Sequence, residues 1–421
     1  MGLLTLLVSA IISLVNKRKR LGVSVMSKLR VRIGILSIAL LSMCGIVITP
    51  VFSEIIKAFP KVPATTVQMI GSLPSLGQLI ISLVVGRLAM SIPKKRLALV
   101  GILAVIIGGI VPIFWHNQIS VLLICAFIVG IGVGFVSTLT PMLISIFFKG
   151  EARASMMGFN TAFNSLGAVL MMSAAGILGN GMWFHSYYVF LLAVLVFFIV
   201  LLFLPLDHVE HIDSEKQQDK VSTMSVLKQL NKYVFAITIF VFLTIFLYTA
   251  FSNNLSILIA QKQVGGTSLA GLLSSFGTLG GMLTGFLMAY IRKIAHKYIL
   301  ELSALLLAAS YLVMYFANAI PLLFIGAFLS GMGMCICMAT APFEISILTN
   351  EQQNSLGMSL FIFSNALGGI VSPIILGWLH ITAGTQTFLV IGTMMAVIAL
   401  ILMIVHFSQK ISSQCSINTT N

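Results

Sequence analysis

Long apolar runs recur along the chain between short polar segments, and this alternation predicts membrane-spanning helices. A helix needs about 20 apolar residues to cross a hydrocarbon core of roughly 30 Å. Backbone amides cannot stay unpaired in lipid, and the runs lack the alternating pattern of barrel strands, so we expect α-helices. Twelve such spans are expected at about residues 33–53, 66–88, 98–115, 119–147, 156–178, 187–206, 233–252, 268–290, 299–317, 321–347, 357–379 and 387–407.

The composition supports a protein that is solvated by lipid. Of the 421 residues, 59% are hydrophobic and 8% are charged, and the mean hydropathy is +1.10. Soluble globular proteins contain about 25% charged residues, so a water-soluble globule is excluded. The predicted fold class is an all-α membrane protein with twelve transmembrane helices.

The net charge of +14 would suggest a nucleic-acid partner in a soluble protein, but its distribution gives it another meaning here. With both termini in the cytoplasm, 21 of the 24 Lys and Arg residues lie in cytoplasmic segments. Lys57, Lys61 and Lys262 lie outside. This asymmetry follows the positive-inside rule. We therefore expect a multi-pass protein of the cytoplasmic (inner) membrane and no nucleic-acid partner.

One long hydrophilic stretch divides the spans six and six. The expected organisation is an N-terminal cytoplasmic or interfacial segment at 1–32, a six-helix bundle at 33–206, a cytoplasmic linker at 207–232, a second bundle at 233–407 and a cytoplasmic tail at 408–421. The apolar start of the chain is too short to span a membrane. It is either an interfacial anchor or an over-extended translation start that precedes Met26.

The two halves are copies of each other. A shift of 201 residues aligns the fourth and fifth spans with the tenth and eleventh, so that Ala126, Phe127, Gly130, Pro141, Asn164 and Gly176 meet Ala327, Phe328, Gly331, Pro342, Asn365 and Gly377. A shift of 200 pairs Gly71, Ser75 and Gly77 with Gly271, Ser275 and Gly277. Two parallel six-span repeats are typical of a rocking transporter with its substrate near the membrane midplane.

The loop after the second span resembles the hallmark loop of the major facilitator superfamily. It runs from Gly86 to Arg96 and keeps the opening glycine, Leu88 and the closing basic trio, but Met90 replaces the usual aspartate and Pro93 the usual glycine. The second-half segment from Gly285 to Lys293 is more degenerate. The resemblance implies two pseudo-symmetric six-helix bundles that transport a small solute.

The basic loop and one carboxylate are the candidates for coupling or gating. Arg87, Lys94, Lys95 and Arg96 are expected to anchor neighbouring helix ends through their C-terminal dipoles, or merely to orient the span. Ionisable groups inside spans are costly and therefore point to function. Glu344 lies inside the tenth span, so it is either a proton-titrating or gating carboxylate or an interfacial glutamate.

Polar residues near the middle of the spans are the candidates for substrate contact, since amides and a phenol bind a polar solute without a fixed charge. They are Gln78, Asn160, Asn164, Tyr248, Asn253 and Asn365. Asn164 and Asn365 are repeat mates, but such pairs also form structural hydrogen bonds between helices. Gly130, Gly132, Gly134, Gly331 and Gly333 are expected to be packing surfaces rather than ligand contacts.

No enzyme chemistry is expected from the chain. The histidines lie mostly in loops or at span ends, without the spacing of an intramembrane metalloprotease, and the five cysteines fit neither a disulfide nor a zinc framework. No cofactor and no metal are predicted. The expected partners are a small-molecule substrate, the lipid bilayer and protons as candidate coupling ions, and a monomer is expected.

Several absences favour an uptake permease. The resemblance implies that drug and proton antiporters carry a Gly-Pro pair in the fifth span, an arginine in the fourth and an acid in the first. This chain has Met171-Met172, Ala126 and no charge before Glu54 at those places. A drug or metabolite efflux antiporter and a non-transporting sensor of the same fold remain as alternatives.

The solute class follows from a second set of absences. The first and seventh spans lack arginine, which argues against organophosphate or nitrate, because those anions call for a guanidinium clamp. A neutral, weakly acidic or amphipathic solute fits better. The seventh span with Tyr248, and the run from Gly265 to Leu272, are loosely similar to the cyanate and nitroimidazole permease group.

Overall fold

The structure is a computed structural model that describes residues 29–205, 230–295, 298–349, 351–379, 381 and 383–411. Most of the predicted N-terminal segment, linker and tail therefore lies outside the described residues. The described part contains twelve helices long and apolar enough to span a membrane, as predicted. No described residue belongs to a β-strand, so the all-α fold class is confirmed.

Several spans are longer than the apolar runs alone suggested, because their helices continue into polar residues at the ends. The first span is Leu29–Ala58. The others are α3 Ala64–Ser91, α4 Lys94–Phe114, α5 Ile119–Phe147, α6 Gly150–Leu178, α7 Leu191–Phe203 with the preceding 3-10 helix η3 Trp183–Phe190, α9 Lys232–Gln261, α10 Thr267–Ala295, α11 Ile299–Phe316, α12 Ile320–Leu348, α13 Glu351–Trp378 and α14 Thr385–Val405.

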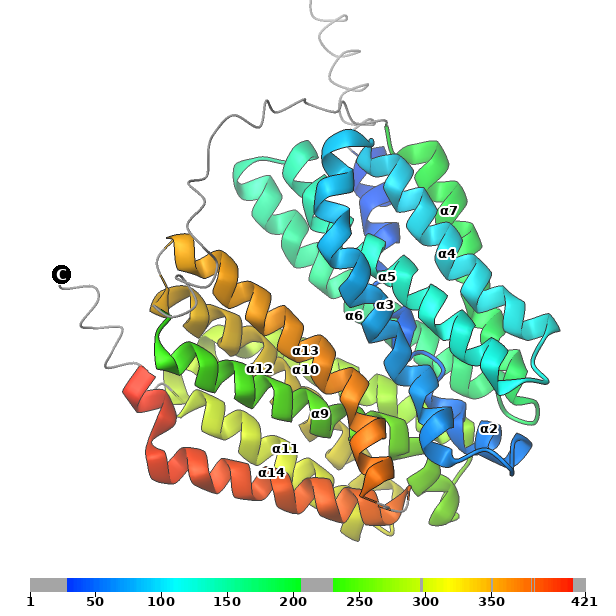
Figure 1. Cartoon of the computed structure of the whole chain (residues 1–421), viewed down its shortest axis with the longest axis vertical. Helices are drawn as coiled ribbons and strands as arrows, with labels where there is room; N and C mark the ends of the chain where they lie inside the picture. The colour runs from blue at the N-terminus through cyan, green and yellow to red at the C-terminus, as the bar shows by residue number, and fades with distance from the viewer. Residues whose placement is uncertain are drawn as a thin grey trace, which may run out of the picture.

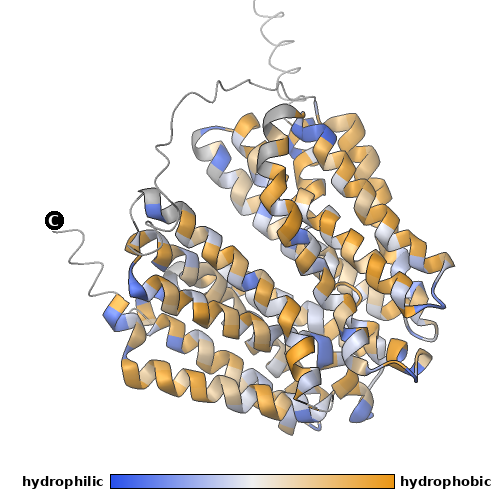
Figure 2. Ribbon diagram, viewed as in Figure 1, coloured by the Kyte–Doolittle hydropathy of each residue, from blue (hydrophilic) through white to orange (hydrophobic). Residues whose placement is uncertain are grey.

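The helices form two bundles with separate cores (Figure 1). One hydrophobic core draws its residues from 35–204 and the other from 230–411. Apolar residues also cover the outer faces of both bundles (Figure 2), as expected of surfaces that face lipid. The bundles touch mainly where α6 meets α10 and where α3 meets α13.

The two bundles converge at one end of the molecule and diverge at the other (Figure 1). We call the end at which residues 205 and 230 lie the linker end. The opposite end, which carries the loop of residues 59–63, is the far end. This geometry defines the space between the bundles in which a site can form.

Matching glycines bring helices together in both halves. A Cβ atom added to Gly77 of α3 would lie 2.6 Å from the carbonyl oxygen of Phe127 in α5. In the second half, a Cβ on Gly331 of α12 would lie 1.7 Å from the carbonyl oxygen of Gly277 in α10. Backbones approach this closely in lipid because packing, rather than the hydrophobic effect, drives helix association there. The internal sequence repeat therefore corresponds to similar close contacts between helices in the two halves.

Lys262, one of the three basic residues expected outside, has a structural partner. Its Nζ donates to the carbonyl oxygens of Met314, Tyr315 and Ala317, at 3.2, 2.5 and 2.5 Å. These carbonyls lie at the C-terminus of α11, where the helix leaves them without intrahelical partners. Partial burial lowers the pKa of Lys262 from its usual value. The lysine thus stabilises a helix end at the far end of the second bundle.

Gly331→Ala is expected to destabilise the second bundle, because the new methyl group has no space beside Gly277. Overpacking of this kind typically costs about 1–3 kcal/mol. Thermal unfolding of the purified protein in detergent would measure it. Gly158→Ala is the matched control, since a Cβ at Gly158 meets nothing within 4 Å. Equal unfolding temperatures for both variants would contradict the packing argument.

Candidate functional site

A polar cavity of about 260 Å³ lies between the two bundles. We call it the central cavity. It is walled by α3 and α5 of the first half and by α13 of the second. Its lining residues are Ser75, Gln78, Leu79, Ser82, Ser137, Thr138, Ile362, Asn365 and Ala366. Two of the predicted substrate contacts, Gln78 and Asn365, therefore face one cavity from opposite halves.

The chemistry of the central cavity is that of neutral hydrogen-bonding groups. Gln78 Nε2 donates to Ser137 Oγ at 3.3 Å, and Ser137 Oγ donates to the carbonyl of Gly134 at 3.4 Å. Across the cavity, Asn365 Nδ2 contacts the sulfur of Met338 at 3.5 Å. None of the nine lining residues is ionisable. Amides and hydroxyls of this kind bind a polar solute that carries no charge.

The first span is not a continuous helix, contrary to the simple expectation from its apolar run. The α-helix ends at Ala39, and short 3-10 helices η1 (Cys44–Ile46) and η2 (Thr49–Val51) follow before α2 (Phe52–Ala58). Several N–H groups in this stretch donate to the carbonyl of the third residue before them, among them those of Leu41, Cys44 and Val47. Pro50 lacks an N–H and contributes to the interruption. Irregular backbone at membrane depth requires partners from the protein.

Asn164 supplies such partners and therefore has a structural role. We assign its amide nitrogen to the side that faces the first span, where the carbonyl oxygen of Ala39 lies at 2.8 Å and Ser42 Oγ at 3.1 Å. One turn along α6, a Cβ on Gly167 would lie 2.1 Å from the carbonyl oxygen of Leu40. α6 therefore supports the end of the first half-helix. The repeat mates Asn164 and Asn365 occupy different environments.

Asn160 and Tyr248 stand apart from the central cavity. Asn160 is half-buried in α6, and its side-chain oxygen is buried without a hydrogen-bond partner. The Tyr248 ring packs beside Phe251 in the second core, with ring centroids 5.9 Å apart. Neither residue lines the central cavity.

Asn253 lies in a cluster of amides that joins the two bundles at the far end. Its Nδ2 donates to the carbonyl oxygen of Gln68 and to Ser72 Oγ, each at 3.3 Å. Gln68 Nε2 in turn donates to Asn254 Oδ1 at 2.9 Å. Gln68, Asn253 and Asn254 are almost fully buried. We call these three residues, with Ser72, the amide cluster.

The contact between α6 and α10 is also hydrogen-bonded toward the far end. Ser173 and Ser275 share a hydrogen bond of 2.7 Å, and Ser275 Oγ donates to the carbonyl oxygen of Val169 at 3.0 Å. Thr267 Oγ1 donates to the carbonyl oxygen of Gly176 at 3.0 Å. These bonds and the amide cluster hold the bundles together on the same side of the central cavity.

Glu344 lies on α12 next to a cation. It is half-buried and interacts electrostatically with Arg292 in the last turn of α10. The Arg292 guanidinium carbon also lies 3.8 Å from the centroid of the Phe343 ring. The pair therefore connects α10 and α12 close to the linker end. Glu344 does not line the central cavity.

The basic loop contacts a neighbouring helix end. Lys95 Nζ donates to the carbonyl oxygen of Leu201 at 2.9 Å, in the last turn of α7. This is the helix-end contact expected of the loop. Lys94 is half-buried and Arg96 is exposed. The side chain of Arg87 lies outside the described residues.

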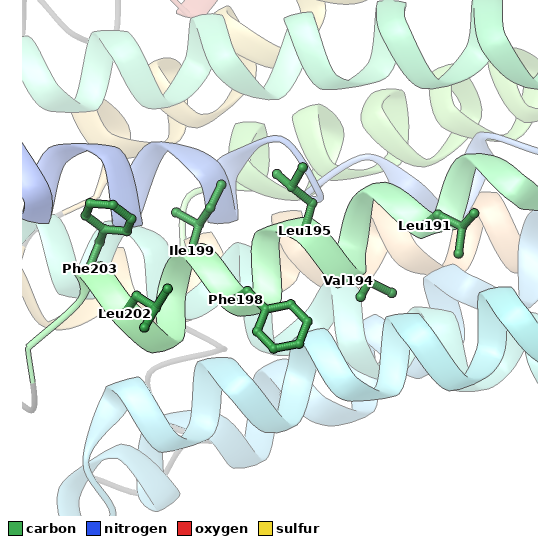
Figure 3. A pocket seen from close by; sticks show the side chains of 7 residues that line it. All are labelled: Leu191, Val194, Leu195, Phe198, Ile199, Leu202 and Phe203. Carbon is green, nitrogen blue, oxygen red and sulfur yellow. The ribbon is translucent and has the colours of Figure 1, made fainter.

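A hollow on the surface of the first bundle is a different feature, lined by apolar side chains alone. It measures about 470 Å³ and lies on the outer face of α7 (Figure 3). Leu195, Phe198 and Leu202 line it and are more than half exposed. In a bilayer such a surface is covered by lipid chains.

Sequence reasoning missed the hydroxyls of the central cavity and three members of the amide cluster, Gln68, Ser72 and Asn254. Ser75 carried a signal, because it is the repeat mate of Ser275, which joins α10 to α6. Gln68 and Asn254 carried none, since single amides near span ends are common. Their role depends on contacts between residues 186 positions apart.

The chain belongs to the Major Facilitator Superfamily, whose sequence profile matches residues 34–300 and 242–413. The family consists of transporters, so the chain is a multi-pass membrane transporter and not an enzyme. No curated protein matches the chain.

Solved transporter structures share the fold. The nucleoside transporter NupG is 13% identical with a TM-score of 0.73, and 90% of this chain and 98% of that one are covered. A bacterial homolog of the human lysosomal transporter Spinster, solved in an inward-facing and unoccupied conformation, is 12% identical with a TM-score of 0.70, covering 92% and 97%.

Asn164→Leu and Asn365→Leu are expected to behave differently although they are repeat mates. Loss of the Asn164 amide removes its hydrogen bonds to the Ala39 carbonyl and the Ser42 hydroxyl, and the Ala39 carbonyl keeps only the Ser42 N–H, so stability should fall by about 1–3 kcal/mol. Asn365→Leu should leave the unfolding temperature nearly unchanged and weaken solute binding. Thermal unfolding with and without solute would distinguish the two. Similar destabilisation by both variants would contradict the assignment.

Proposed function

We propose that this transporter is an uptake permease of the cytoplasmic membrane that moves a small neutral polar solute by alternating access. The observation that carries the proposal is the central cavity, which both halves wall with amides and hydroxyls while hydrogen bonds join the halves at the far end. A solute held there contacts both bundles at once. Rocking of one bundle against the other would then expose it to the two sides in turn.

The orientation follows from the distribution of basic residues. The linker end carries the basic loop after α3, and cytoplasmic segments are enriched in Lys and Arg. The linker end is then cytoplasmic, the far end is exterior, and the present arrangement is inward-facing. The Spinster homolog, which shares the fold, was solved in an inward-facing conformation.

The solute class rests on the lining of the cavity. No lining residue offers a charge to an anion or a cation, whereas Gln78 and Asn365 offer amides from opposite sides. A neutral solute with several hydrogen-bonding groups fits this set. Because the nucleoside transporter NupG shares the fold, uridine is a reasonable first probe.

A disulfide across the far end is expected to stop transport. A Cβ atom built on Gly377 of α13 lies 3.4 Å from the Cβ of Thr65 in α3, close to the separation of about 3.8 Å found in disulfides. Uridine counterflow in proteoliposomes containing Thr65→Cys/Gly377→Cys should fall to background after oxidation and recover with dithiothreitol. Each single cysteine variant is the control. Unchanged flux through the fully cross-linked protein would contradict alternating access.

Proton coupling through Glu344 is the second part of the proposal. Glu344 is a carboxylate inside a span and beside Arg292, whereas Glu301 accepts hydrogen bonds from Ser408 N and Oγ, and the side chain of Glu351 at the start of α13 lies outside the described residues. Protonation of Glu344 would remove its attraction to Arg292 and loosen the link between α10 and α12. The step couples proton binding to helix movement.

Uptake is therefore expected to rise as the external pH falls, and Glu344→Gln should abolish this dependence because glutamine cannot take up a proton. Initial rates in proteoliposomes with an imposed pH gradient would measure both. Glu54→Gln is the matched control, since Glu54 forms a partly exposed pair with Lys57 at 2.8 Å. Full pH dependence in Glu344→Gln would remove this carboxylate from the coupling step.

A further inference from the structure

A second polar cavity lies between the bundles at the far end. It measures about 270 Å³, close to the size of the central cavity. We call it the far-end cavity. Its polar lining comes from Thr65 and Gln68 of α3, Asn254 of α9 and Thr387 of α14, and its apolar lining includes Leu376 and Ile381. The mixed lining, with no ionisable residue, is typical of a site for a small neutral ligand.

The far-end cavity shares two residues with the amide cluster. Gln68 and Asn254 line it, and the hydrogen bond between them crosses from the first bundle to the second. α3 and α13 contribute lining residues to both cavities, and the amide cluster also joins α3 to α9, where Ser72 Oγ accepts from Asn253 Nδ2. The Gln68–Asn254 bond therefore forms part of the wall of the far-end cavity.

The two residues of the Gln68–Asn254 pair differ in the number of other hydrogen bonds that fix their side chains. Asn254 Oδ1 also accepts from the backbone N–H of Gly384 at 2.9 Å, and Asn254 Nδ2 donates to the carbonyl of Ala250 at 2.9 Å. Asn254 thus keeps its position when Gln68 leaves. The Gln68 amide is the part of the pair that can exchange its partner.

We propose that the far-end cavity is a second solute site, at which a small neutral amide or imide binds by replacing the Gln68–Asn254 hydrogen bond. Such a solute carries a donor beside an acceptor, so it can donate to Asn254 Oδ1 and accept from Gln68 Nε2. Binding exchanges an inter-bundle hydrogen bond for two bonds to the solute. It therefore loosens the closed far end while the solute is held. The inference rests on the proposed transport function and adds an exterior site to it.

The contact between α6 and α10 supports this assignment by contrast. It is the repeat-related counterpart of the α3–α13 contact, since Ser275 and Gly176 are the mates of Ser75 and Gly377. At the α6–α10 contact, Ser275 bonds to Ser173 and to the carbonyl oxygen of Val169, and Thr267 bonds to the carbonyl oxygen of Gly176. At the α3–α13 contact, Ser75 lines the central cavity and Gly377 lines the far-end cavity. The structure keeps one contact closed and leaves room for solute along the other.

Protection of an engineered cysteine tests the proposal without measuring flux. Ala64→Cys places a thiol in the lining of the far-end cavity, and Lys61→Cys places one on the exposed loop nearby. The rate of alkylation by N-ethylmaleimide at each position is followed by peptide mass spectrometry, so the native cysteines do not contribute. Uracil is the probe, and 1,3-dimethyluracil, which lacks N–H donors, is its matched control.

We expect uracil to slow alkylation at position 64 but not at position 61, and dimethyluracil to have little effect. Gln68→Leu should raise the uracil concentration for half-protection about three- to tenfold, as expected for one lost hydrogen bond. Gln78→Leu, in the central cavity, should not change it. Equal protection in the wild type and Gln68→Leu, or none by uracil, would overturn the proposal. If the far-end disulfide still stops uridine counterflow in that case, the transport function stands and only the second site falls.

Discussion

The need to give every buried backbone polar group a partner governs this structure, because lipid offers none. Helices meet the need internally except at their ends and interruptions, and the chain places specific side chains there. Lys262 donates to three carbonyl oxygens at the end of α11, and Lys95 donates to one at the end of α7. Asn164 donates hydrogen bonds to the interrupted first span. A polar residue that looks like a candidate for function can thus be present because a backbone carbonyl or N–H needs a hydrogen-bond partner.

Neutral polar groups carry most of the contact between the bundles. Serines and threonines form the bonds between α6 and α10, and amides form the bond between α3 and α9. Hydrogen bonds between helices in membranes are modest, typically about 0.6 kcal/mol each and reaching roughly 1–2 kcal/mol, so a few of them hold an interface that can still separate. A set of buried ion pairs would be harder to open, because separated charges would remain in a medium of low dielectric constant. The choice of amides suits an interface that must close and reopen.

The sequence predicted the fold well and the site only in part. Span number followed from apolar length, and the glycine contacts followed from the repeat, since Gly77 and Gly331 occupy tight helix crossings in both halves. Gln78 and Asn365 were predicted as separate polar residues, and the fold placed them on one cavity. Asn253 was expected near the midplane but lies in the amide cluster, because its depth depends on how far α9 extends toward the far end. The interruption of the first span was not predicted, since its apolar run contains only one proline, and its cause includes the close approach of Gly167 to Leu40.

The interrupted first span has a mechanical consequence. A 3-10 helix rises about 2.0 Å per residue and an α-helix about 1.5 Å. The two 3-10 helices together contain six residues. Their conversion to α-helix would shorten the span by about 3 Å, from the difference in rise. The span therefore contains an adjustable length, which lets its two ends stay anchored at opposite membrane surfaces while the bundle tilts or the bilayer changes thickness.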